Sequence, residues 1–186
     1  MIWLIVLIVV VLLLVVLAIA FYNRLVRYRN RVDNAWAQIE VQLKRRWDLI
    51  PNLVETVKGY AAHERGTFEA VTAARTNAQQ AQTPAETAQA EGILGQALGR
   101  LFAVAEAYPE LQADENFRQL QTELSETENR IAVSRQVYND SVLTYNNSIQ
   151  TFPGAVLAGP FGFTAREFYD VEDAAQREPP QVDFAT

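Results

Sequence analysis

The pattern of hydrophobic and polar positions divides the chain into two unlike parts. Residues 2–21 are twenty consecutive apolar side chains, and as a helix they would be about 30 Å long, which matches the hydrocarbon core of a bilayer. Ala18-Ile19-Ala20 resembles the cleavage site of a signal peptide. However, no basic region precedes the run, and it is longer than the apolar region of such a peptide. We therefore predict an uncleaved transmembrane anchor over residues 1–21.

The remainder of the chain has helical periodicity, and no alternating strand pattern is long enough to compete. No Gly or Pro interrupts residues 2–50, so we expect the anchor helix to continue into the body. Asp48 can then cap a second, antiparallel helix with Pro51 in its first turn. Thr83-Pro84-Ala85-Glu86 combines a capping box with Pro at the first helical position, which predicts the start of a third helix. Asp114 can cap the fourth.

The predicted fourth helix shows the clearest repeat in the chain. Its large apolar residues are seven positions apart: Phe117, Leu124, Ile131, Tyr138, Tyr145 and Phe152. Such a repeat indicates left-handed, near-parallel packing of long helices. We therefore predict an all-α fold, in which the single transmembrane helix is continuous with an antiparallel bundle of four long helices over residues 22–152. An irregular tail follows over residues 153–186, apolar at first and then acidic.

Residues 152–163 are apolar yet rich in Pro and Gly. Counting the directions of the four helices places the start of this segment near the bilayer surface. Irregular backbone cannot enter hydrocarbon with its amides unpaired, so we expect the segment in the membrane interface or against another subunit. The alternative is that Phe161 and Phe163 fold back onto the bundle, because large exposed apolar patches are rare. The acidic residues 166–186 end in a Pro-containing stretch, which predicts an extended tail.

Basic side chains follow the anchor, and no charged side chain precedes it. Basic flanks are retained in the cytoplasm, so we predict the N-terminus outside and the bundle in the cytoplasm. The residues expected at the membrane surface are Trp3, Tyr22, Arg24, Arg27, Arg29 and Arg31. Residues 22–48 carry seven basic and three acidic side chains, whereas residues 49–186 carry nine basic and nineteen acidic ones. An acidic body argues against nucleic-acid binding, which needs a basic surface.

Residues that could carry chemistry are few. The chain has no Cys and one His. His63-Glu64 begins like a zinc-protease motif, but the second His would fall at position 67, where this chain has Thr67. The sequence contains no Gly-rich phosphate loop, nucleophile elbow or kinase signature. We therefore predict no catalytic residue, no cofactor and no metal, and we expect a protein that is not an enzyme. A hydrolase would require carboxylates from separate helices to converge.

Several short runs resemble the LemA family. They are Ala35-Trp36, residues 48–54, 57–64 and 103–111, Glu123-Leu124-Ser125, Thr127-Glu128-Asn129, Tyr138-Asn139, Tyr145-Asn146, Phe152-Pro153 and Phe161-Gly162-Phe163. The resemblance extends from the anchor to about Phe168. It implies a bacterial single-span membrane protein with a bundle of long helices. It implies no settled reaction, and it hints that partners are membrane proteases or other envelope proteins.

Two functions are compatible with these observations. The first is a membrane-anchored, non-enzymatic helical scaffold or interaction protein of the bacterial envelope, self-assembling and inserted once in the inner membrane. The alternative is a regulatory or sensor subunit that docks on a membrane enzyme or protease. The expected partners are the lipid bilayer, further copies of the chain and a membrane protein. The residues expected to make interactions are Tyr138, Tyr145, Phe152, Phe161 and Phe163.

Overall fold

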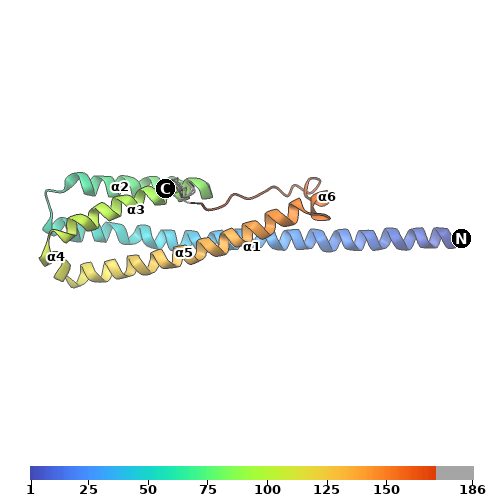
Figure 1. Cartoon of the computed structure of the whole chain (residues 1–186), viewed down its shortest axis with the longest axis horizontal. Coiled ribbons are helices and arrows are strands. Elements are labelled where there is room, and N and C mark those ends of the chain that lie inside the picture. Colours follow the sequence, from blue (N-terminus) through green and yellow to red (C-terminus); the bar gives the residue numbers. More distant parts are fainter. Residues whose placement is uncertain (171–186) are drawn as a thin grey trace, which may run out of the picture. The chain divides into compact units, whose positions relative to one another are not determined.

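A computed structural model describes residues 1–170, and their regular structure is helical (Figure 1). The helices in this part of the chain are α1 (Ile2–Tyr60), α2 (Arg65–Gln80), α3 (Pro84–Glu106), α4 (Pro109–Ala113), α5 (Glu115–Gln150) and α6 (Gly154–Ala158). The predicted all-α class is confirmed. The single four-helix bundle over residues 22–152 stays a prediction. The acidic end of the predicted tail, residues 171–186, lies outside the described residues.

The apolar N-terminal segment is the first third of α1. Its side chains are exposed along residues 2–17, and an 18-residue window of mean hydropathy 3.8 has no buried residue. Soluble helices of this composition bury their apolar side chains, because exposing them to water is unfavourable. The helix is long and apolar enough to cross a membrane, and the predicted continuity between this segment and the following residues is confirmed.

The second helix predicted from Asp48 does not exist as a separate element. α1 continues through Pro51 to Tyr60. A proline inside a helix removes one N–H donor, so the carbonyl four residues earlier loses its partner. That carbonyl belongs to Trp47, and it accepts a hydrogen bond of 2.7 Å from Nε of Arg75 on α2. Arg75 thus satisfies the group that Pro51 leaves unpaired, and the turn to α2 falls at residues 61–64 instead.

The described chain forms two compact units. The first unit comprises Met1–Arg46 and Ser125–Phe168, and the second is built on Trp47–Leu124. The second unit packs α2 and α3 against the end of α1 and the start of α5 around a core of buried apolar side chains. Its largest members are Ile50, Leu53, Phe68, Leu94, Leu98, Leu101, Leu111, Phe117 and Leu124.

Two predicted helix starts in the second unit are confirmed. Oγ1 of Thr83 accepts a hydrogen bond from the backbone N–H of Glu86, and the Glu86 carboxylate accepts one from the backbone N–H of Thr83. Together they form the predicted capping box, with Pro84 at the first helical position. The carboxylate of Asp114 accepts a hydrogen bond of 2.9 Å from the backbone N–H of Phe117 at the start of α5. The short helix α4 between these sites was not predicted.

The core of the first unit lies between α1 and α5. The sevenfold positions of α1, Leu25, Val32 and Ile39, are buried, and so are Ile131, Tyr138 and Tyr145 of α5. The predicted repeat of the last long helix therefore marks buried positions of α5, and the same sevenfold spacing marks buried positions of α1. Phe152 breaks the pattern, because α5 ends at Gln150 and the Phe152 side chain is 84% exposed.

Candidate functional site

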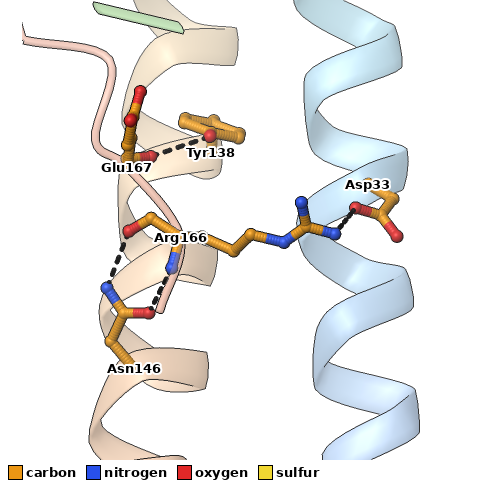
Figure 2. Close-up of polar contacts among 5 residues, drawn as sticks. All are labelled: Asp33, Tyr138, Asn146, Arg166 and Glu167. Carbon is orange, nitrogen blue, oxygen red and sulfur yellow. Dashed lines mark hydrogen bonds and ion pairs between the residues drawn. The ribbon is translucent and has the colours of Figure 1, made fainter. Parts of the chain in front are cut away.

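An extended segment, residues 163–168, returns along the α1–α5 pair of the first unit; we call it the strap. Its backbone is held by the side-chain amide of Asn146 on α5 (Figure 2). Nδ2 of Asn146 donates a hydrogen bond of 2.9 Å to the carbonyl of Arg166, and the N–H of Arg166 donates one of 2.9 Å to Oδ1 of Asn146. One planar amide thus satisfies both backbone groups of Arg166, which otherwise have no secondary-structure partner.

The strap also contacts both helices through further polar groups (Figure 2). The guanidinium of Arg166 lies 2.9 Å from the carboxylate of Asp33 on α1. Both side chains are about half exposed, so this ion pair contributes about 0–1 kcal/mol and acts mainly by orienting the strap. The hydroxyl of Tyr138 donates a hydrogen bond of 2.8 Å to the carbonyl of Glu167. The strap therefore links α1 to α5 through the side chains of Asp33, Arg166 and Tyr138, in addition to that of Asn146.

Two tyrosines predicted as interaction residues are buried in the first unit. Tyr138 and Tyr145 are 3% and 1% exposed, and the Tyr138 ring packs on Trp36 of α1 with 5.3 Å between the ring centroids. Burial raises the pKa of Tyr138 to about 12, because the phenolate would lose its hydration. Burial also raises the pKa of Tyr145. In this structure the contacts of both tyrosines are internal to the unit.

The strap begins at an aromatic junction beside the end of the apolar segment. The ring of Tyr22 makes edge contacts with Phe161 and Phe163, with centroid distances of 5.0 and 5.6 Å. The guanidinium of Arg29 lies 5.4 Å from the centroid of the Phe163 ring, a cation–π contact. Phe163 is buried, whereas Phe161 is 55% exposed. Folding back onto the helices thus describes Phe163, and Phe161 only touches them at one edge.

Residues 152–162 connect α5 to the strap, and we call them the apolar loop. Contrary to the expectation of wholly irregular structure, the loop contains the short helix α6. Gly154 lies so close to α5 that a Cβ atom there would collide with the backbone carbonyl oxygen of Ser148. Phe152, Val156 and Phe161 are exposed on the loop. The close approach at Gly154 and the junction at Tyr22 position this loop at its two ends.

The predicted membrane-flanking residues differ in their surroundings. Trp3 is exposed near the start of α1. Nε of Arg24 donates a hydrogen bond of 2.9 Å to the hydroxyl of Tyr28. Arg27 and Arg31 line an open groove of about 570 Å³ between α1 and α5, together with Asn30, Asn34, Gln38, Asp140 and Thr144. The arginines after the apolar segment therefore divide between contacts within the protein and an open polar surface.

Sequence reasoning missed the residues that hold the strap. Asn146 falls in a run that resembles the LemA family, but nothing in its local pattern predicts a bond to a residue twenty positions later. Asp33 and Arg166 are 133 positions apart. The polar side chains at this site bind the backbone of the strap or pair with each other. Within residues 1–170, no group of three or more His, Asp or Glu side chains is placed to hold a metal ion.

Comparisons with known proteins identify relatives of this chain. The LemA family model matches residues 35–184. Magnetosome protein MamQ 2 of Paramagnetospirillum magneticum is 30% identical over 179 residues, covering 82% of this chain and 66% of that protein. Magnetosome protein MamQ of Magnetospirillum gryphiswaldense is 28% identical with the same coverage. Protein LemA of Metamycoplasma hominis is 30% identical over 135 residues, covering 70% of this chain and 60% of that protein. The chain thus spans less than two thirds of the length of these relatives.

Proposed function

The chain belongs to the LemA family, and we propose that it is a membrane-anchored, non-enzymatic helical scaffold or interaction protein of the bacterial envelope. The observation that carries this proposal is the continuity of α1. The helix runs without interruption from a fully exposed apolar segment into the buried positions Leu25, Val32 and Ile39 of the first unit. Because the helix has no break, the anchor in the bilayer fixes where the first unit lies relative to the membrane surface.

The polar residues of the candidate site support a structural role. Asn146, Asp33, Arg166 and the hydroxyl of Tyr138 all form bonds within the first unit. A catalytic site instead needs groups that converge on a space where substrate can bind. These residues instead hold a backbone segment in place, which supports a structural role.

A fractionation experiment tests the anchor. The full chain and a variant lacking residues 2–21 are expressed, and membranes are washed with alkaline carbonate. We expect the full chain to stay in the membrane pellet and the deletion variant to be released, because residues 2–21 supply the apolar area that lipid must cover. Release of the full chain by carbonate would contradict membrane anchoring.

Self-assembly is tested on the full chain purified in mild detergent. Native mass spectrometry should give complexes whose masses are multiples of the chain. A complex with a different membrane protein in fixed stoichiometry would instead favour the regulatory-subunit alternative. A monomer alone would contradict the scaffold proposal in its self-assembling form.

A further inference from the structure

We propose that the apolar loop is a second membrane-contact site, which inserts Phe152, Val156 and Phe161 into the interfacial region of the bilayer beside the anchor. The partner of this surface is lipid. The inference rests on the proposed membrane anchorage and extends it, since it assigns the bilayer as the partner of a segment more than 130 residues away from the anchor in sequence.

The position of the loop comes from its contact with Tyr22. Residues 2–21 form the apolar segment of α1, and Tyr22 is the next residue. Its ring contacts Phe161 with 5.0 Å between the centroids. When residues 2–21 occupy the hydrocarbon core, Tyr22 is at the depth where interfacial tyrosines are found. Phe161 must then lie at nearly the same depth.

The surface chemistry of the loop suits this depth. Phe152, Val156 and Phe161 are 84%, 63% and 55% exposed, and no charged side chain occurs from Thr151 to Ala165. In water these side chains would remain hydrated at a free-energy cost proportional to their apolar area. Arg24, Arg27, Arg29 and Arg31 follow Tyr22 along α1, and anionic headgroups attract such basic side chains.

Most backbone N–H groups of the loop are paired within the protein, as a medium poor in water requires. The N–H groups of Ala155, Val156, Phe161, Gly162 and Phe163 all donate hydrogen bonds to carbonyls between Thr151 and Gly159. Pro153 and Pro160 have no N–H. Unpaired amides are the main obstacle to placing non-helical backbone in a membrane. Here that obstacle is largely removed, although the loop is not one regular helix.

The strap and Gly154 make the loop a rigid contact. Phe163 is buried between Tyr22 and Arg29, and Arg166 is held by Asn146 and Asp33. At the other end, Gly154 lies against the carbonyl of Ser148 on α5. A loop held at both ends inserts without a large loss of conformational entropy. Two contacts with one bilayer, the anchor and the loop, then restrict the tilt of α1 and orient the first unit.

The test uses the full chain with single cysteines, because the natural chain has none. An environment-sensitive NBD dye is attached to Val156→Cys, and the protein is reconstituted in nanodiscs of phosphatidylcholine and phosphatidylglycerol. Lipid carrying a doxyl group near the top of its acyl chain quenches dyes in the interface. The matched control is Val41→Cys, which is equally exposed at 63% in the same unit but about 30 Å along α1 from the apolar segment.

We expect strong quenching and a blue-shifted emission at position 156, and neither change at position 41. Phe152→Cys, also exposed, gives a second probe should the Val156 variant fold poorly, as judged by circular dichroism. Leu17→Cys reports the anchor itself. Quenching at position 17 without quenching at 156 and 152 would overturn this proposal and leave the anchor intact. Absence of quenching at position 17 would instead contradict the anchor.

A second copy of the chain is the competing occupant of the loop. Dyes at position 156 on neighbouring copies would then quench one another. Adding unlabelled protein would relieve this self-quenching, so the emission per dye would rise. Mutual quenching of the dyes without quenching by doxyl lipid would overturn the lipid assignment in favour of a protein contact.

Discussion

At the scale of single residues, one side-chain amide replaces a strand partner. Asn146 pairs with both backbone groups of Arg166. Asn146→Ala should leave these groups to water and loosen the strap, with a loss of about 1–2 kcal/mol for two hydrogen bonds of net modest strength. Hydrogen exchange of the Arg166 amide, followed by mass spectrometry, measures the effect. Asn147→Ala, at the exposed neighbouring position, is the control. Unchanged exchange at Arg166 would show that other contacts hold the strap.

Pro51 and Arg75 are linked through the backbone carbonyl of Trp47, which Pro51 leaves unpaired and Arg75 binds. Arg75→Ala removes the donor to the part-buried Trp47 carbonyl and should cost about 1–3 kcal/mol, because this acceptor loses its charged hydrogen-bond partner. Pro51→Ala restores an N–H that can pair with this carbonyl within α1. In the Pro51→Ala background, Arg75→Ala should therefore cost less. Thermal unfolding of the four variants measures the coupling. The exposed Arg100→Ala is the control, and strictly additive effects would contradict the pairing.

The buried hydroxyl of Tyr138 links stability to alkaline pH. Its pKa is about 12 in the folded chain against an ordinary value of 10.0, so the folded state favours the protonated form. This contribution to stability is fully present below about pH 10 and is lost as the pH rises from there to about 12. Tyr138→Phe should lower the melting temperature at neutral pH by removing the bond to Glu167, yet flatten the alkaline decline. An equal decline in both proteins would contradict the assignment.

At the scale of elements, α6 depends on a close approach that only glycine permits. Gly154→Ala would place a Cβ against the carbonyl of Ser148, and we expect a cost of about 1–3 kcal/mol from overpacking. Gly159 is a matched control, because its φ of -58° is helical and no atom lies within 4 Å of a Cβ built there. Gly159→Ala should be neutral or slightly stabilising. Melting temperatures in detergent compare the two, and equal effects would argue against the close approach.

At the scale of the whole molecule, the distribution of charged residues along the chain indicates the orientation of the protein in the membrane. Four arginines follow the apolar segment directly, which predicts a cytoplasmic body. Val41→Cys should resist an impermeant maleimide in intact cells and react after permeabilisation. Trp3→Cys, at the other end of the segment, should react in intact cells. The opposite labelling pattern would reverse the proposed orientation.

Features that depend on short stretches of chain could be predicted from the amino-acid sequence. The apolar segment, the capping box at Thr83, the cap at Asp114 and the sevenfold burial of Tyr138 and its equivalents are set by composition, spacing and neighbours within one or two turns. These signals are local, so they persist without knowledge of the packing. The all-α class followed from them.

The other features could not be predicted, because they depend on contacts between residues that are distant in sequence. α1 continues through Pro51 because Arg75, on another helix, pairs with the freed carbonyl. The strap is placed by Asn146 and by Asp33, which is 133 positions from Arg166. Phe161 and Phe163 look alike in the sequence, and both contact Tyr22 in the fold. Phe163, which also lies against Arg29, is buried, whereas Phe161 is 55% exposed. A local sequence pattern does not reveal such partners, because these contacts form only when the chain has folded.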